Sequence, residues 1–341
     1  MILFILAIVI GLALLVWSAD RFVDGAVGVA RFLGMSTFLI GMVIVGFGTS
    51  APELVVSILS AMNDTPQLAL GNAYGSNIAN IALILGTTAI IAPIVVKKQA
   101  MRLDIPVLIL MTALTIFLVK DGNVSFLDGV ILLFAFVAVM SFNIWHELNE
   151  KRKRKQAVSE DALDDESSEP AESVSIAKSL LWLFVGLGVL VGSSRMLVWG
   201  AVGMAHALGV SDLLIGLTIV AVGTSLPELA SSIAAARKGE NDLAVGNVIG
   251  SNIFNTLVVV GIAAVITPIN ATDPEVLIRD LPIMSALTLL LFFICFPLTK
   301  NRKDERLKGN RFGFGRIGGV LFLMLYVGYL VLLGLDANGV I

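Results

Sequence analysis

The chain has few charged residues, and it almost lacks the residue types that build zinc, copper or disulfide sites. Only 14% of its 341 residues are Asp, Glu, Lys or Arg, whereas about a quarter of the residues are charged in soluble domains. A single cysteine, Cys295, excludes a disulfide framework, and two histidines are too few for a zinc or copper site. Any bound metal ion would therefore be held by oxygen atoms. The net charge of -3 gives no basic face for nucleic acid.

The sequence is instead rich in long apolar runs. Hydrophobic residues make up 57% of it, and the mean hydropathy is +0.93. Since a spanning helix needs roughly 20 apolar residues, we predict an all-α integral membrane protein with ten transmembrane helices. No basic residue precedes the first run and no small-x-small cleavage pattern follows it, so we expect a span there rather than a signal peptide. The predicted spans are 2–31, 36–61, 68–92, 104–119, 126–146, 176–206, 211–236, 243–266, 280–298 and 314–335.

A polar segment, residues 147–175, separates a first five-helix part, 1–146, from a second, 176–341. This linker opens with the basic run KRKRK at 151–155 and continues with acidic residues, which predicts a disordered segment with a basic membrane-proximal anchor. With ten spans, most of the 23 Lys and Arg residues fall on one face of the membrane. The positive-inside rule then predicts a multi-pass cell-membrane protein with a cytoplasmic linker and both termini outside.

The two five-helix parts are copies of one unit. A shift of 175 residues aligns GFGTSAPELVVS at 46–57 with AVGTSLPELASS at 221–232, and GNAYGSNIAN at 71–80 with GNVIGSNIFN at 246–255. Each pair has seven identical positions and no gap, which indicates a duplication. Because each part holds an odd number of predicted spans, the two parts would be inverted repeats. Inverted repeats are typical of secondary transporters, which bind their substrate near the bilayer midplane.

Each GTSxPE motif combines a helix break with an acid. Pro52 and Pro227 lack an amide hydrogen, so they predict interrupted helices. Glu53 and Glu228 follow them in apolar spans, where an unpaired acid costs about 2.5–3.5 kcal/mol. Neither motif contains a basic residue, so a bound cation is the simplest partner.

Hydroxyl and amide side chains recur around both acids, and they are hard oxygen ligands of the kind that calcium and sodium take. Taken singly, such residues in spans usually serve helix packing and interhelical hydrogen bonds. Their paired recurrence beside an acid favours ion binding. Asn77 and Asn252 either bind an ion or tie the broken backbone. The candidate ligands are Thr49, Ser50, Ser76, Asn80, Thr224, Ser225, Ser251 and Asn255.

With GTSAPEL and GSNIAN in one half and GTSLPEL and GSNIFN in the other, nearly the whole chain resembles the sodium/calcium exchanger branch of the cation/calcium exchanger superfamily, in its compact prokaryotic form. The resemblance implies a midplane site where calcium and sodium compete under alternating access, with no cofactor besides the transported ions. Glu53 and Glu228 would be the central ligands, with Asn80 and Asn255 at the amide or acid positions. The flanking sodium sites would use Thr49, Ser50, Ser76, Thr224, Ser225, Ser251 and backbone carbonyls near Gly46 and Ala221.

The sequence therefore predicts a sodium-driven calcium antiporter rather than an enzyme, in which the long first and sixth spans slide past the other eight. Its expected partners are the transported cations and the lipid bilayer, with no nucleic acid and no obligate protein partner. A proton-coupled calcium antiporter is the nearest alternative, although such exchangers tend to carry Gly-Asn-Ala-x-Glu where this chain has Gly-Thr-Ser-x-Pro-Glu. A cation channel with the glutamates around a pore is the alternative from a different class. Some relatives have aspartate in place of Asn255, so the amide argues against potassium co-transport.

Overall fold

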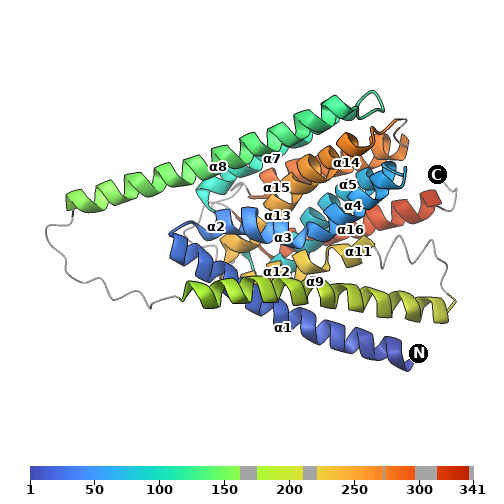
Figure 1. Cartoon of the computed structure of the whole chain (residues 1–341), viewed down its shortest axis with the longest axis horizontal. Helices are drawn as coiled ribbons and strands as arrows, with labels where there is room; N and C mark the ends of the chain where they lie inside the picture. Colours follow the sequence, from blue (N-terminus) through green and yellow to red (C-terminus); the bar gives the residue numbers. More distant parts are fainter. Residues whose placement is uncertain (162–174, 210–220, 271, 273, 296–312, 338–341) are drawn as a thin grey trace.

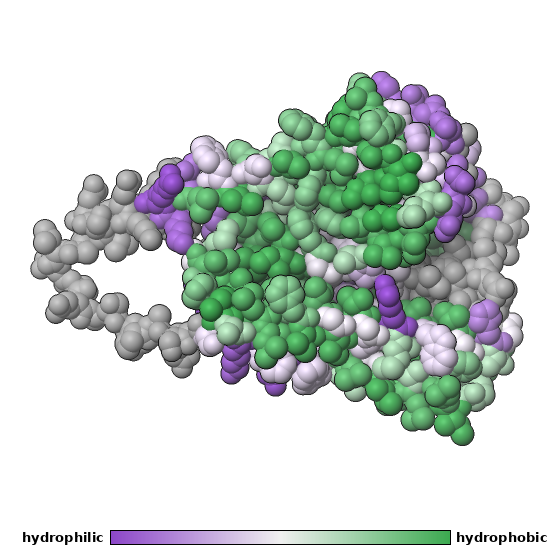
Figure 2. Space-filling view, in the orientation of Figure 1, coloured by the Kyte–Doolittle hydropathy of each residue, from purple (hydrophilic) through white to green (hydrophobic). Residues whose placement is uncertain are grey.

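The protein folds as a bundle of long helices (Figure 1). The computed structural model describes residues 1–161, 175–209, 221–270, 272, 274–295 and 313–337. Exposed apolar side chains cover broad areas of the face drawn in Figure 2, and many of the hydrophilic side chains lie toward its two ends. Such a surface is suited to hydrocarbon on its sides and to water at its ends.

The first half contains several helices that pass through segments of π-helix, in which hydrogen bonds span five residues; these segments are labelled η. Its elements are α1 (Ile2–Leu33), α2 (Thr37–Ile40), η1 (Gly41–Val45), α3 (Gly46–Thr49), α4 (Ala51–Met62), α5 (Gln67–Ile78), η2 (Ala79–Leu85), α6 (Gly86–Ile91), β1 (Ile94–Val95), η3 (Ala100–Asp104), α7 (Ile105–Val119) and α8 (Phe126–Asp161).

The second half repeats this pattern where it is described. Its elements are α9 (Ile176–Ala207), α11 (Ala221–Thr224), α12 (Leu226–Arg237), α13 (Asn241–Phe254), η5 (Asn255–Val259), α14 (Val260–Ile266), η6 (Val276–Asp280), α15 (Leu281–Cys295), β2 (Gly313–Phe314) and α16 (Arg316–Ala337).

The helical membrane protein expected from the sequence is confirmed. Within the described ranges, eight helical runs are long and apolar enough to cross a bilayer, and the bent pair Thr37–Thr49 with Ala51–Met62 makes a ninth. The predicted span 211–236 begins among residues outside those ranges, and its described part is α11 and α12. The tenth span therefore stays a prediction. The two-residue strands β1 and β2, which pair antiparallel, are a small departure from an all-α fold.

Helix α8 differs from its predicted extent. It continues past residue 146 to Asp161, so the KRKRK run is helical instead of opening a disordered segment. The physical reason is that Lys, Arg, Glu, Gln and Ala are good helix formers, and a helix already formed in the membrane propagates without a new nucleation cost. Residues 162–174 of the predicted linker lie outside the described part of the chain.

Helices α1 and α9 run side by side along one edge of the bundle (Figure 1). Aromatic pairs join them at two levels. The rings of Phe4 and Trp199 have centroids 5.2 Å apart, and those of Trp17 and Trp182 are 6.0 Å apart. Both pairs meet edge to face, a favoured geometry for aromatic side chains. The first and sixth predicted spans thus form one packed unit.

Helix α13 crosses the α2–η1–α3 run in the interior of the bundle, and its residues 243–254 are all buried. The two backbones approach each other closely at Gly246 and Gly250. A Cβ atom added at Gly250 would lie 2.2 Å from the carbonyl oxygen of Met42, and one at Gly246 would lie 2.3 Å from that of Phe38. Only glycine allows this approach. It holds the GNVIGSNIFN segment of the second half against the helical run that leads into the GTSAPE motif of the first half.

The substitution Gly250→Ala is expected to lower the thermal stability of the protein, because its methyl group must push a backbone carbonyl away. Overpacking of a core typically costs about 1–3 kcal/mol. Thermal unfolding of the detergent-purified protein measures the effect. The control is Gly328→Ala, since Gly328 is an exposed helical glycine of α16 with no described atom within 4 Å of an added Cβ. Equal loss of stability in both variants would contradict the close approach.

Further backbone contacts join the halves at two places. Gly86 in α6 packs against Gly319 in α16, and Gly129 in α8 packs against Gly261 in α14. Beside the first contact, β1 pairs with β2 through Ile94 and Phe314. Beside the second, an isolated antiparallel bridge joins Val124 to Ile269. Each half is therefore tied to the other by the same kind of helix and strand contacts.

Candidate ion-binding site

Both proline motifs interrupt their helices, as predicted. Helix α3 ends at Thr49, Ser50 has ψ 6°, and α4 begins at Ala51 after a bend of 46°. Ser225 has ψ 7° and separates α11 from α12 in the same way. Pro52 and Pro227 each lie in the first turn of the following helix, where a missing amide hydrogen is tolerated. The breaks bring new helix N-termini into the middle of the molecule.

Glu53 and Glu228 occupy the first turns of α4 and α12, and each is only 1% exposed. The first-turn amide groups of a helix lack intrahelical acceptors and carry a partial positive charge, which favours an anion there. No Lys or Arg of the described residues forms an ion pair with either glutamate. Two acidic side chains are thus buried with helix ends and, among the described residues, no basic partner around them.

The two glutamates belong to one site. The Ser50 hydroxyl donates to the Glu228 carboxylate over 3.0 Å, so a residue of the first motif binds the acid of the second. Ser76 contacts the Glu53 carboxylate, and Glu53 and Glu228 are close enough to interact electrostatically. Thr49 also faces the Glu228 carboxylate. Five of the predicted site residues are therefore linked directly.

The neighbouring helices contribute a second group of predicted residues. The Ser251 hydroxyl donates to the Gly46 carbonyl over 3.3 Å, and the Asn80 amide donates to the Asn252 side-chain oxygen over 3.0 Å. Asn77 donates instead to the Thr256 hydroxyl over 2.8 Å. For Asn77 and Asn252 the structure therefore gives side-chain contacts between halves rather than a tie to the broken backbone.

Two asparagines that the sequence reasoning passed over hold the glutamate-bearing turns. Asn72 donates to the backbone carbonyl of Glu53 over 3.0 Å and to Ser57 over 3.1 Å. Asn247 donates to the backbone carbonyl of Glu228 over 3.3 Å and also to Ser231 and Ser232. The sequence could have indicated these two residues, because both are identical positions of the repeated segments that begin with Gly-Asn. Both amides therefore hold the turns that carry the acids.

The last four predicted ligands lie in the second half of the chain. Ser225 and Asn255 are buried, and Thr224 is half-buried beside the helix break. Ala221 lies at the start of α11, and its side chain is outside the described part of the structure. The structure thus places these residues on the second broken helix and on η5.

Several buried oxygen atoms near the break points accept no hydrogen bond from the described residues. A buried polar atom without a partner is costly, and a cation surrounded by such oxygens would remove the cost. These atoms are Glu53 Oε2, Glu228 Oε2, Asn77 Oδ1, Asn80 Oδ1, Ser225 Oγ and Asn255 Oδ1.

The sequence model of the family described as sodium/calcium exchanger protein matches residues 3–145 and 178–335, which is nearly the whole chain. The chain belongs to the sodium/calcium exchanger family. Membership confirms the resemblance noted from the two motif pairs, and it makes the protein a membrane transporter of ions rather than an enzyme. Sodium/calcium antiport is the activity of this family.

Named relatives and solved structures agree with this family. The putative antiporter CaxA of Alkalimonas amylolytica is 41% identical over 96% of this chain and 97% of its own. The sodium/calcium exchanger MaX1 of Methanosarcina acetivorans is 29% identical over 96% of this chain and 97% of its own. A structure of the sodium-calcium exchanger NCX_Mj, soaked with zero Na+ and Ca2+, superposes with a TM-score of 0.79 at 32% identity and covers 97% of this chain and 98% of that one.

Proposed function

We propose that this protein exchanges calcium for sodium across the cell membrane at a site centred on Glu53 and Glu228. The observation that carries the proposal is the meeting of these two buried acids, one from each half, with no basic partner among the described residues. A divalent cation neutralises both charges, and calcium takes about six to eight oxygen ligands. The proposed ligands are Glu53, Glu228, Asn80, Asn255, Thr49, Ser50, Thr224, Ser225, Ser76, Ser251 and the carbonyls of Gly46 and Ala221.

Competition for the same carboxylates makes the exchange obligatory in this proposal. Calcium and sodium both need Glu53 and Glu228, so occupancy by both at once is electrostatically unfavourable. An empty site is also unfavourable, because two buried carboxylates repel each other and have lost their water. The protein therefore changes conformation only with calcium or sodium bound. Each conformational change, in either direction, then moves ions across the membrane.

We propose further that the halves are inverted repeats. The pairing of Ile94 with Phe314 has a counterpart in the bridge between Ile269 and Val124. Positions 94 and 269 differ by the repeat offset of 175. The partner of Ile94 lies in the second half, whereas the partner of Ile269 lies in the first half. The glycine contacts of α6 with α16 and of α14 with α8 follow the same exchange. A twofold axis in the membrane plane explains both pairs of contacts.

An asymmetry between the halves supports alternating access. Helix α1 packs along α12, and Ala234 of α12 is 5% exposed. Its repeat counterpart Leu59 of α4 is 52% exposed, and the described residues of α9 and α4 make no comparable contact. In the orientation given by the positive-inside rule, this arrangement is closed toward the cytoplasm and open toward the outside. A slide of the α1–α9 pair past the remaining helices would reverse it.

A sodium gradient is expected to drive calcium uptake into proteoliposomes at equal pH on both sides. A tenfold gradient supplies about 1.4 kcal/mol per sodium ion, and none is present in vesicles loaded with potassium. Radiolabelled calcium uptake should therefore appear in sodium-loaded vesicles and stay at background in potassium-loaded ones. Uptake driven by a pH gradient without sodium would indicate a proton-coupled antiporter. Calcium conductance that needs no counter-ion would indicate a channel, and either result would overturn the proposal.

A further inference from the structure

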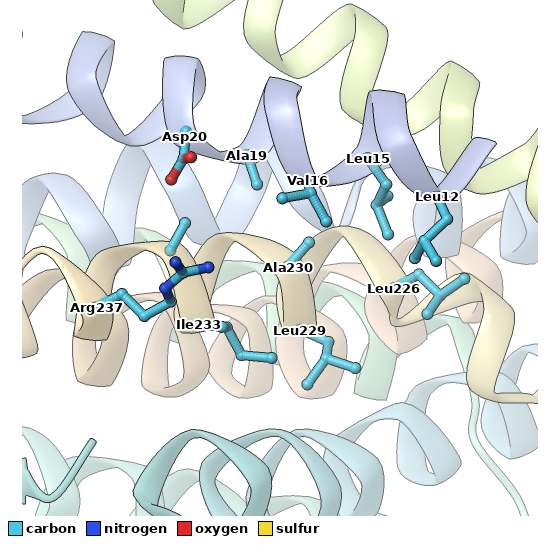
Figure 3. Close-up of a pocket in the computed structure, with 11 residues that line it drawn as sticks. Leu12, Leu15, Val16, Ala19, Asp20, Leu226, Leu229, Ala230, Ile233 and Arg237 are labelled. Atoms are coloured by element: carbon cyan, nitrogen blue, oxygen red, sulfur yellow. The ribbon is translucent and has the colours of Figure 1, made fainter. Parts of the chain in front are cut away.

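A groove lies between α1 and α12 and has a volume of about 210 Å³ (Figure 3). None of the proposed ion ligands lines it. Its walls are apolar along most of their length, with Leu12 and Val16 from α1 facing Leu226, Leu229 and Ile233 from α12. Leu12 and Val16 are also about half exposed, so the groove opens to the surroundings of the bundle. Because α1 is a membrane span, those surroundings are lipid.

The groove has one charged end. Asp20 and Arg237 lie there, whereas Leu12 and Leu226 lie at the opposite end (Figure 3). Both helices run in the same direction along the groove, so its length follows the two helix axes. The positive-inside rule places the end with Arg237 at the cytoplasmic surface. The groove thus runs from that surface toward the bilayer midplane and changes from polar to apolar on the way.

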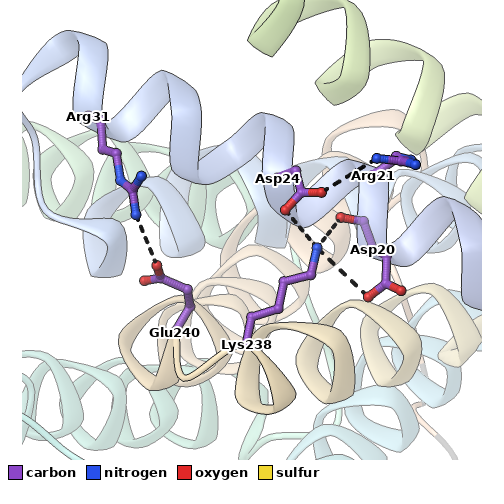
Figure 4. A network of polar contacts seen from close by, with 6 residues as sticks. All are labelled: Asp20, Arg21, Asp24, Arg31, Lys238 and Glu240. Atoms are coloured by element: carbon purple, nitrogen blue, oxygen red, sulfur yellow. Dashed lines mark hydrogen bonds and ion pairs between the residues drawn. The ribbon is translucent and has the colours of Figure 1, made fainter. Parts of the chain in front are cut away.

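Among the described residues around this end, Arg237 is a basic residue without an ion pair. Lys238 contacts the Asp24 carboxylate at 2.7 Å and that of Asp20 at 3.8 Å, and Arg31 contacts Glu240 at 3.9 Å (Figure 4). Arg237 has no ion pair with any residue that the structure describes, and its side chain is exposed. Lys238 and Arg21 together balance the charges of Asp20 and Asp24, so an anion at this end meets the Arg237 guanidinium without a net negative charge beside it. Arginine binds phosphate groups through two parallel hydrogen bonds.

We propose that this groove binds an anionic phospholipid of the cytoplasmic leaflet, with one acyl chain along the apolar walls and the phosphate on Arg237. The ligand is an amphiphile because the groove has one charged end and one apolar end. It is a membrane lipid because the long side of the groove opens to the bilayer. Basic residues at the cytoplasmic surface favour anionic headgroups.

The bound lipid also regulates transport. One wall of the groove belongs to α1, which slides in our proposed function, and the other belongs to α12, which stays. A ligand that contacts both walls binds this arrangement more tightly than one in which they have moved apart, so it shifts the population toward the cytoplasm-closed state. This regulatory part rests on the proposed function, whereas the binding itself does not.

Photolabelling in proteoliposomes tests the binding. The probe is phosphatidylglycerol with a diazirine near the end of one acyl chain, and mass spectrometry locates the labelled peptides. We expect labels on segments 12–19 and 226–234, displaced by unlabelled phosphatidylglycerol more readily than by phosphatidylcholine. Labels spread evenly over the exposed apolar faces, or equal displacement by both lipids, would overturn the proposal.

Four variants make the test specific. Ala230→Trp fills the groove, and Val55→Trp adds the same side chain at the repeat counterpart, where Val55 is 45% exposed. Labelling of the two segments should fall severalfold in Ala230→Trp only, and Arg237→Gln should remove the preference for phosphatidylglycerol. Equal labelling in both tryptophan variants would contradict the groove as the binding site. The variant Glu53→Gln should keep full labelling, so failure of the ion site and failure of the lipid site give different results.

Discussion

Replacing Glu53 or Glu228 with glutamine is expected to abolish sodium-driven calcium uptake while the protein still folds. Glutamine keeps the size of the side chain but removes one of the two negative charges of the site. At about 4 Å and an effective dielectric constant of about 20, one pair of unit charges contributes about 4 kcal/mol, which corresponds to about a thousandfold in affinity. Radiolabelled calcium uptake by either variant in proteoliposomes should therefore fall to the level of protein-free vesicles.

The matched control for these variants is Glu275→Gln. Glu275 is exposed just before η6, so the same chemical change occurs at the surface rather than at the buried acids. This variant should transport calcium normally, and all three variants should elute as single species with thermal stability similar to that of the unmodified protein. Normal sodium-driven calcium flux in a folded Glu53→Gln or Glu228→Gln protein would show that the two acids do not form the ion site.

Most of the helical architecture could be predicted from the sequence because hydrocarbon imposes a strong constraint. A spanning segment must satisfy its backbone hydrogen bonds internally and expose apolar side chains, so apolar length alone located α1, α9 and α16 to within a few residues. The end of α8 was predicted wrongly because hydropathy reports where the membrane ends, not where the helix ends. The π-helical segments such as η2 and η5 leave no trace in hydropathy, so they could not be predicted.

The candidate site could be predicted in outline because an acid in an apolar span is rare and costly. Glu53 and Glu228 stand out for this reason, and the constant repeat offset indicates that they form a pair. The supporting contacts were harder to predict. Asn72 and Asn247 have the same residue type as the amides predicted to face an ion, and only their bonds to the glutamate carbonyls reveal their positioning role.

The conformational asymmetry could not be predicted from the repeats. Two copies of one sequence unit indicate a pair of equivalent arrangements, and they do not select which one is adopted. The contacts that differ between the copies include those of Lys238 with Asp20 and Asp24. The repeat counterpart of Lys238 is Asn63, and that of Asp20 is Arg195, so the opposite side of the molecule does not carry the same ion pairs.

Replacing Asn255 with aspartate is expected to tighten calcium binding by tenfold or more and to raise the sodium concentration needed to release it. Asn255 is 0% exposed in η5, and neither polar atom of its side chain has a partner among the described residues. In our proposal this side chain faces the ion. A third carboxylate there adds an attraction of about 4 kcal/mol per unit charge at about 4 Å, opposed by its own desolvation. Calcium should therefore bind more tightly, and maximal exchange should slow, because release becomes limiting.

Replacing Asn255 with alanine should act in the opposite direction, since it removes one oxygen ligand without adding charge. A hydrogen-bond-like contact to a charged group contributes about 1.5–3 kcal/mol, so the calcium concentration for half-maximal uptake should rise at least about tenfold. The control Asn63→Asp adds the same negative charge at an exposed residue after α4, and solvent screening should leave its calcium affinity nearly unchanged. Opposite shifts in the two Asn255 variants require direct contact with the ion. Equal, same-direction shifts would instead indicate that Asn255 only supports helix packing.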